Sequence, residues 1–236
     1  MLRIGFVLWL FAANALAQQV TPAIGVHSYA VHGIYEGEPM PSWTAEAALR
    51  DTVVQGGTGV HLAFRTRFDG SGWRYRFSAM WTPQDLRRIT ATWDGDTRDG
   101  SRRCDVTVAA DSIIANGQRQ VISGAPGPIV PEFAVGYVVS TMPLAVGDSL
   151  SLRSVRCALS SYDLMIFDLR AHVSEIEHKR SAHQQAEPAW LIKGGAAYPY
   201  ELVVAQKDRM VLREVIPQGS VGLEIREYQA TRDPQL

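Results

Sequence analysis

Two short acidic stretches have residue types that bind metal ions. Asp94-Gly95-Asp96-Thr97-Arg98-Asp99-Gly100 has oxygen ligands at alternate positions, as a calcium loop does, but its fifth position is an arginine and no acid follows at the twelfth. Gly and Asp at this density also form ordinary hairpin turns. In the second stretch, Glu175 and Glu177 share one face of a strand while His178 points to the other, and His183 lies further along. We therefore predict no metal site, with a weak calcium site as the alternative at the first stretch.

Ser149 is the candidate nucleophile. It lies in Gly147-Asp148-Ser149-Leu150, the block that carries the nucleophile in GDSL-type esterases. Those enzymes are α/β proteins with the block near the mature N-terminus, and an Asp-x-x-His pair near the C-terminus supplies their base. Here the block is late, and none of the histidines after it has an aspartate three residues before it. A serine without a positioned base is a weak nucleophile, so we predict a turn before a strand and no catalytic residue.

Aromatic side chains are the strongest remaining signal. Seven of them fall within about thirty residues, on what the alternation predicts to be the inner face of adjacent strands. They are Phe64, Phe68, Trp73, Tyr75, Phe77, Trp81 and Trp93. Rings of this size either fill a small barrel or line a cavity for an apolar ligand. We take the seven as predicted cavity-lining residues, and a filled core is the alternative.

These aromatics belong to the clearest hairpin in the chain. Val60–Phe68 and Trp73–Trp81 alternate between apolar and polar residues, and Asp69-Gly70-Ser71-Gly72 joins them. Such arms with a Gly-rich connection predict a β-hairpin. Four arginines fall on the face opposite the aromatics: Arg65, Arg67, Arg74 and Arg76. They are most simply a solvated row, and the alternative is a binding edge for an anionic partner.

The same alternation recurs along the chain. Strands are predicted over Val26–Tyr35, Trp43–Val54, Ile89–Trp93, Cys104–Ala110, Leu150–Cys157 and Leu164–Ile176. Asn116-Gly117, a strong tight-turn pair, separates Ile113–Ala115 from Gln120–Ile122. A C-terminal meander is predicted over Tyr200–Ala205, Met210–Ile216 and Val221–Ile225. We expect one all-β domain, an antiparallel, strongly curved sheet or barrel of about ten strands.

One region breaks this pattern. The prolines between Gly124 and Pro131 lack ladder donors and cannot sit in a central strand. Glu132–Met142 then predicts one short helix, with Pro131 suited to its first turn and Pro143 ending it.

The first residues predict export. Met1–Ala17 has one positive charge, Arg3, then an apolar run of about ten residues, too short to span a bilayer of ~30 Å as a helix. It closes on Ala15-Leu16-Ala17, the small-x-small pattern that a signal peptidase cuts. We predict cleavage before Gln18, a single domain over residues 18–236 and a periplasmic or secreted location. The alternative is a short anchor that stays attached; no cysteine follows the cut, so a lipid anchor is not expected.

Charge and cysteine usage fit that location. The net charge of −1 gives no electrostatic reason to expect nucleic acid or an anionic membrane face. The two cysteines, Cys104 and Cys157, would lie in a compartment that favours oxidation. A bridge between them would close a loop of about 54 residues and add ~4 kcal/mol at most. We predict this disulfide, and two separate buried thiols are the alternative.

The C-terminal third contains four segments with a common order of strands and turns: Ala189–Ile192, Tyr198–Val204, Arg209–Glu214 and Gly219–Glu224. In these segments the chain resembles a family of exported bacterial proteins of unknown function, and Leu144–Leu150 is similar to the family's turn before a strand. That family in turn resembles the LolA/LolB lipoprotein carriers and other half-barrel envelope proteins. The resemblance implies a curved antiparallel sheet around an apolar cavity, with a helix closing one mouth. It supplies no catalytic residue.

We therefore expect an exported, non-enzymatic envelope protein without a cofactor, which binds a lipid or other apolar molecule in its interior while Glu132–Met142 moves as a lid. The alternative is a structural or interaction module of the periplasm, with a filled core and an envelope protein as partner. An outer-membrane barrel is disfavoured, because the chain ends in Asp233–Leu236 rather than in an aromatic terminal strand and the face opposite the aromatic residues is rich in arginine. A hydrolase would require Ser149 to react with an active-site probe.

Overall fold

The computed structural model describes residues 23–67, 74–83, 85–97, 100–109, 112–122, 127–159, 161–180, 184–195, 199–218 and 222–229. The first half of the sheet contains β1 (Gly25–Tyr35), β2 (Glu38–Pro39), β3 (Trp43–Val54), β4 (Gly57–Arg67), β5 (Arg74–Thr82), β6 (Asp85–Thr97), β7 (Gly100–Val108), β8 (Ser112–Ala115) and β9 (Gln118–Val121). After β10 (Ile129–Pro131) come a 3₁₀ turn, η1 (Glu132–Ala134), and a helix, α1 (Val135–Ser140). The second half contains β11 (Ser149–Cys157), β12 (Leu164–His178), β13 (Glu187–Gly194), β14 (Glu201–Ala205), β15 (Val211–Gln218) and β16 (Gly222–Gln229).

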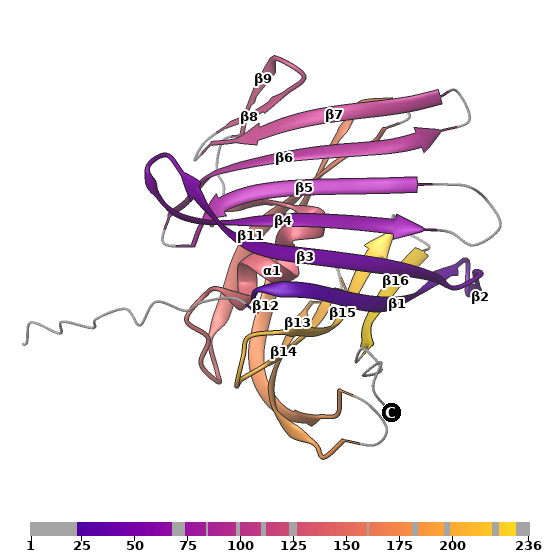
Figure 1. Cartoon of the computed structure of the whole chain (residues 1–236), viewed down its shortest axis with the longest axis vertical. Helices are drawn as coiled ribbons and strands as arrows, with labels where there is room; N and C mark the ends of the chain where they lie inside the picture. Colours follow the sequence, from indigo (N-terminus) through magenta and orange to yellow (C-terminus); the bar gives the residue numbers. More distant parts are fainter. Residues whose placement is uncertain are drawn as a thin grey trace, which may run out of the picture.

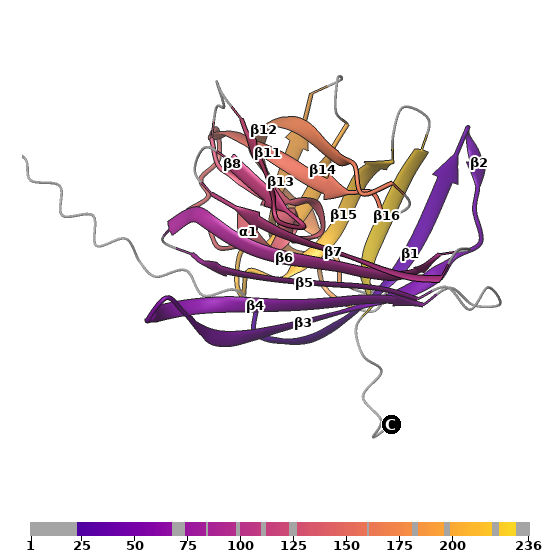
Figure 2. The ribbon, with the colours of Figure 1, turned by 90° about the horizontal axis from the view of Figure 1, so that it is seen from above.

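All these strands belong to one strongly curved sheet that does not close on itself. Its order is β10-β11-β12-β13-β14-β15-β16-β1-β3-β4-β5-β6-β7-β8-β9, with β2 paired to β1. The β1–β16 pair joins the two halves, so β10 and β9 are the two edges. Figures 1 and 2 show β3–β7 as one wall and β11–β16 as the other. The prediction of an all-β, strongly curved sheet is confirmed.

Two details of that prediction need correction. The described part of the chain has sixteen strands rather than about ten. Short strands account for part of the difference: β2 and β10, with two and three residues, are too short to show an alternation, whereas β8 and β9 are the arms of the predicted Asn116-Gly117 turn. The sheet is also not wholly antiparallel, since β10 runs parallel to β11. The proline-rich approach to β10 explains its place: a strand that ends in Pro131 lies at an edge.

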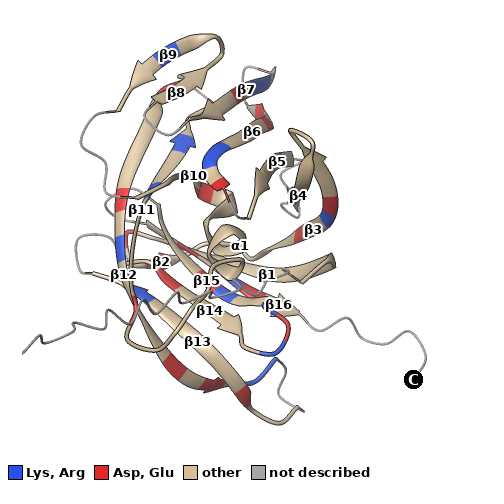
Figure 3. Ribbon diagram, turned by 90° about the vertical axis from the view of Figure 1, so that its left-hand side faces the viewer, with Lys and Arg blue, Asp and Glu red and all other residues tan. Residues whose placement is uncertain are grey.

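The short helical insertion lies inside the sheet. Every residue of η1 and α1 is buried, and Figure 3 shows α1 at the centre of the ring of strands, without a charged residue. We call Glu132–Ser140 the plug. The predicted helix over Glu132–Met142 is therefore shorter than expected, because its first turn is 3₁₀ and its end is tightened by the bonds from Thr141 N–H to Val138 and from Met142 N–H to Val139.

Period-2 alternation builds the wall that faces the plug. On β3, Trp43, Ala45, Ala47 and Leu49 are buried, and the residues between them lie on the other face. The same pattern continues on β4 to β7, and the buried sets of these strands join one hydrophobic core with the plug. Within the described residues, no helix has the length and apolar character needed to cross a membrane.

Candidate functional site

The sequence-predicted aromatic residues lie on the inner face of β4, β5 and β6. Phe64, Phe77, Trp81 and Trp93 are all at most 2% exposed, and Tyr75 is half-buried at the margin of the same core. Phe68 and Trp73 lie outside the described residues. The described members of the set are thus brought to one inner surface, as the alternation predicted.

The plug packs directly against this surface through Phe133. Its ring centroid lies 5.5 Å from that of Phe64, 5.6 Å from that of Phe77 and 5.1 Å from that of Tyr75, all in tilted geometry. Such separations are those of favourable aromatic pairs. Phe77 also meets Trp93 edge-on at 5.1 Å. At this end of the interior, a side chain of the protein itself occupies the position that a ligand would take against the aromatic wall.

A buried ionic cluster holds the plug from the opposite wall. Glu214 on β15 and Arg226 on β16 are each 1% exposed, and Arg226 Nη1 donates to Glu214 Oε2 at 3.0 Å. Glu214 Oε1 accepts from the Tyr200 hydroxyl at 2.8 Å and from the backbone N–H of Gly136 in α1 at 3.2 Å. Burial raises the pKa of Glu214, against the opposing effect of Arg226. Glu214 therefore links strand β15 to the plug.

Arg226 also joins this cluster to the aromatic wall. Its guanidinium lies over the rings of Phe64 and Phe133, with 4.6 Å and 4.5 Å between the guanidinium carbon and the ring centroids. Its Nε donates to Glu224 at 2.6 Å, so the buried cation has two acids and two aromatic faces around it. Cation–π contacts of this kind are strongest where water is excluded. Glu214 and Glu224 thus balance the buried charge, and Arg226 Nη2 contacts Glu224 without a hydrogen bond of its own among the described residues.

A second ion pair fixes the start of the plug. Glu132, 2% exposed, accepts hydrogen bonds from Nε and Nη2 of Arg156 on β11. Burial raises the pKa of Glu132; Arg156 and Arg226 oppose that shift, and Glu224 adds to it. The start and the middle of the plug are thereby bonded to β11 and β15 by charge-assisted hydrogen bonds.

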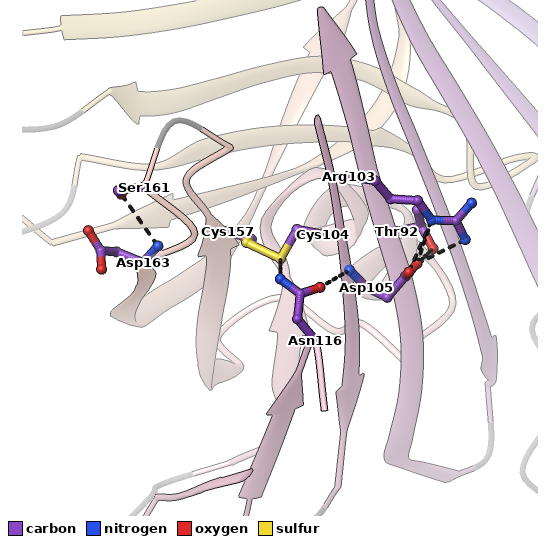
Figure 4. Close-up of a disulfide and its surroundings, with 8 residues drawn as sticks. All are labelled: Thr92, Arg103, Cys104, Asp105, Asn116, Cys157, Ser161 and Asp163. Atoms are coloured by element: carbon purple, nitrogen blue, oxygen red, sulfur yellow. Dashed lines mark hydrogen bonds and ion pairs between the residues drawn. A yellow bond between two sulfur atoms is a disulfide. The ribbon is translucent and has the colours of Figure 1, made fainter. Parts of the chain in front are cut away.

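A disulfide crosses the gap between the two halves of the open sheet. Cys104 on β7 is bonded to Cys157 at the end of β11, with 6.5 Å between their Cα atoms (Figure 4). The Asn116 amide donates to Cys104 Sγ, and its carbonyl oxygen accepts from the Asp105 N–H. The predicted bridge is present, and it joins strands that the hydrogen-bonded order separates by nearly the whole sheet.

The outer face of the same wall is hollowed. Ala48, Ala63, Ser78 and Thr92 lie opposite one another in turn across β3, β4, β5 and β6, and they form a floor of small side chains. Longer side chains flank this floor and enclose a hollow of about 570 Å³: Glu46, Arg50, Arg65, Arg76 and Asp94. A second hollow of about 430 Å³ adjoins it and shares Glu46, Arg65 and Arg76. We call these two hollows together the outer groove.

The arginine face is where the alternation placed it. Arg65 and Arg76 are exposed, on the side of the sheet opposite Phe64 and Phe77. The Arg65 guanidinium donates to Glu46, with 2.8 Å from Nε to Oε2. The backbone register also pairs Arg67 with Arg74 at the end of the same two strands. Sequence reasoning identified this row but not the hollow beside it.

Ser149 has a histidine neighbour that the sequence analysis did not identify. Ser149 begins β11 directly opposite His172 on β12, and Ser149 Oγ lies 3.0 Å from His172 Nδ1. The pairing depends on sheet register, so the missing Asp-x-x-His motif could not reveal it. Gly147 has φ +91° and Asp148 Oδ2 accepts from the Ala145 N–H, so the block is the predicted turn before a strand. The Gly147 and Asp148 N–H groups are bonded to backbone carbonyls and do not form an oxyanion hole.

The two acidic stretches lie in ordinary sheet positions. Asp94-Gly95-Asp96-Thr97 ends β6 and pairs with β7, which confirms a hairpin there; Arg98 and Asp99 lie outside the described residues. In the second stretch, Glu175 accepts a hydrogen bond from the side-chain amide of Gln206. Burial lowers the pKa of His178, and His183 lies outside the described residues. Among the described residues, no group of three or more His, Cys, Asp or Glu side chains is placed to hold a metal ion.

Three residues central to the interior were not among the predicted site residues: Phe133, Glu214 and Arg226. Phe133 did have a signal, because Phe133–Val139 is apolar on all sides, which is typical of a fully buried helix. Glu214 and Arg226 look like the solvated half of alternating strands, and their burial follows only from the position of α1 against β15.

Comparison with known proteins gives no family for this chain. No protein family and no curated protein sequence matches it. Among solved structures it is similar to a beta-barrel-like protein of domain of unknown function DUF1849 from Brucella abortus, with a TM-score of 0.49 and 9% identity over 89% of this chain and 97% of that chain. It is also similar to a DUF1089 family protein from Pseudomonas aeruginosa, with a TM-score of 0.44 and 14% identity over 71% of this chain and 87% of that chain. Neither is described as a lipoprotein carrier.

Proposed function

We propose that the protein is an exported, non-enzymatic binding module of the cell envelope, with a filled interior and its working surface on the outside of the sheet. The observation that carries this proposal is the plug. Its residues are buried throughout. Phe133 lies against the aromatic side chains of the β3–β7 wall, while Glu132 and Gly136 are bonded to β11 and β15 in the other wall. An interior that its own chain fills leaves the outer surface for recognition.

Export and the absence of chemistry are parts of the same proposal. The Cys104–Cys157 bridge supports export, because disulfides persist in oxidising compartments. The backbone N–H groups of Gly147 and Asp148, beside Ser149, are already bonded to backbone carbonyls, which supports a role without catalysis. A fluorophosphonate probe tests the second point: we expect no labelling that Ser149→Ala removes, and labelling at Ser149 would make the protein a hydrolase.

The filled interior is tested by extracting the purified full chain with organic solvent and analysing the extract by mass spectrometry. We expect no stoichiometric lipid and no saturable binding of an environment-sensitive apolar dye. Phe133→Ala is the matched variant, because removing this ring leaves an apolar cavity beside Phe64 and Phe77 that a small apolar molecule can enter. Dye binding by Phe133→Ala alone supports the proposal. Stoichiometric lipid in the unmodified chain overturns it.

A second function is favoured by a separate observation in the core. The indole N–H groups of Trp81 and Trp93 are buried, and neither has a hydrogen-bond acceptor among the residues that the structure describes. Buried indoles ordinarily find an acceptor. If the plug moves aside as a lid, a lipid or acyl ester in the interior would supply one, in the manner of a LolA/LolB-like carrier. This function requires co-purified lipid whose retention falls in Trp81→Phe, which removes the N–H and keeps an aromatic ring.

A further inference from the structure

The outer face of β4 and β5 places like charges directly opposite one another. Register pairs Arg65 with Arg76, both exposed, and the same backbone register pairs Arg67 with Arg74 two residues further along. Like charges directly opposite across an antiparallel pair destabilise it. The arrangement therefore does not serve the stability of the hairpin, and it places the cationic side chains of Arg65 and Arg76 side by side on the exposed face.

The acids around this area neutralise it only in part. Glu46, opposite Arg65 on β3, bonds its guanidinium. Asp94 is opposite Arg76 on β6, yet among the described residues no acid lies within 4.0 Å of the Arg76 guanidinium and no acceptor bonds it. Arg50, on the far side of the small-residue floor, is likewise without a bonded partner in the described chain. Within the described part of the chain, the guanidinium groups of Arg50 and Arg76, which both line the larger hollow, thus have no bonded acid.

The shape of the outer groove suits a ligand with more than one anionic group. Arg65 and Arg76 line both of its hollows, so an anion bound beside them has space on either side. The floor of Ala48, Ala63 and Ser78 lets a ligand approach the sheet without a steric barrier. Exposed ion pairs such as Arg65–Glu46 contribute little to stability, so Arg65 can exchange its partner.

We propose that the outer groove binds a multivalent phosphate-bearing anion, with Arg76 and Arg50 as its principal contacts and Arg65 recruited from Glu46. The planar guanidinium fork matches phosphate oxygens in bidentate geometry. A phosphate group with a charge near −2 competes with the Glu46 carboxylate for Arg65, whereas a single carboxylate has no such advantage. The proposal rests on the proposed function, because it takes the outside of the sheet as the working surface.

Calorimetric titration of the full chain with sodium tripolyphosphate at low ionic strength tests this site. We expect saturable binding that Arg76→Gln weakens by about tenfold or more, the usual effect of losing one charge-assisted contact. Arg170→Gln is the control, since it removes the same charge from an exposed position on β12 in the opposite wall. Equal weakening by Arg170→Gln, or no saturable binding by the unmodified chain, overturns the proposal.

Glu46→Gln provides a test of opposite sign. It frees Arg65 and removes a negative charge from both hollows, so tripolyphosphate binding should tighten several-fold. A variant that merely disturbed the surface would weaken binding. Unchanged or weaker binding by Glu46→Gln contradicts the recruitment of Arg65.

Vesicles identify the source of the phosphate. Co-sedimentation with phosphatidylcholine vesicles containing phosphatidylglycerol, lost in Arg76→Gln, supports the site with a lipid headgroup as ligand. Tripolyphosphate binding without vesicle binding supports it with a soluble phosphate compound as ligand. These readouts are independent of the extraction and dye measurements. Lipid in the interior would contradict the proposed function, whereas a lack of phosphate binding would contradict only the proposed outer-groove site.

Discussion

The inner and outer faces of β4 and β5 differ in how their side chains are partnered. Inside, Phe64 and Phe77 meet Phe133, and the nearby cation Arg226 is bonded to two glutamates. Outside, Arg65 lies opposite Arg76, and its ion pair with Glu46 is exposed to solvent. Burial explains the difference, because an unpaired charge is very costly in the core and inexpensive in water. One hairpin thus has a face that holds the fold together and a face whose charges remain available.

The largest expected effect comes from removing the interior cation. Arg226→Met leaves Glu214 and Glu224 without their common partner, and breaking a buried pair in this way costs about 3–5 kcal/mol. Guanidinium unfolding followed by tryptophan fluorescence measures the change. Arg170→Met, the same substitution at an exposed position, should change the free energy of unfolding by less than about 0.5 kcal/mol. Similar values for the two variants would contradict the distinction between the inner and outer faces.

Removing the covalent link across the sheet opening should have the next largest effect. Cys104→Ser/Cys157→Ser frees two strands that no hydrogen-bonded ladder joins, and the expected loss is about 2–4 kcal/mol. Reducing the unmodified protein with dithiothreitol should lower the unfolding midpoint by a comparable amount and leave the double variant unaffected. A reduced protein as stable as the oxidised one would mean that the edges are held by packing alone.

Gly136→Ala tests how closely the plug fits its wall. A Cβ at this position would lie 2.9 Å from Glu214 Oε1 and 3.1 Å from Leu202 Cδ1, and Glu214 is held in place by Tyr200 and Arg226. We expect a loss of about 1–3 kcal/mol from overpacking. Gly195→Ala, at a site with no heavy atom within 4 Å, is the control and should have little effect. A neutral Gly136→Ala would show that the plug is loosely held.

The buried carboxyls of the interior give stability a pH dependence of unusual sign. Burial raises the pKa of Glu132 and of Glu214 above the value in the unfolded chain. Between those two values the folded protein binds more protons than the unfolded chain, so the stability that these groups contribute is present at mildly acid pH and is lost as the pH rises through the folded pKa. Asp85 and Asp105, whose pKa values arginine hydrogen bonds lower, act oppositely at more acid pH.

This effect is smaller than the preceding three, and it is measured by comparing how the urea midpoint depends on pH in the unmodified protein and in variants. Urea midpoints of the unmodified protein should rise as the pH is lowered from neutrality toward the ordinary carboxyl range. Glu214→Gln, although less stable overall, should show a flatter rise, because one of the two groups no longer titrates. Glu177→Gln, an exposed residue, should keep the original slope. Identical slopes in all three proteins would exclude the buried carboxyls as the cause.

The sequence predicted the two faces of the wall because both follow from period-2 alternation. It also contained the opposed arginines: arms ending at Phe68 and starting at Trp73 pair Arg65 with Arg76 once the hairpin is drawn. The interior contacts were not predictable in this way. Glu214 and Gly136 are 78 residues apart, and their contact depends on how far the sheet curves around the plug. Ser149 and His172 likewise meet only through the β11–β12 register.

The smallest expected effect on stability comes from the outer arginines. Arg65→Gln/Arg76→Gln removes one exposed ion pair and one like-charge pair, two small terms of opposite sign. The free energy of unfolding should therefore change by less than about 0.5 kcal/mol, while tripolyphosphate binding is lost. Both quantities are measured on the same preparation, with Arg170→Gln as the charge-matched control. A destabilisation above about 1.5 kcal/mol would mean that the arginines hold the hairpin together, and the two faces would then share one structural role.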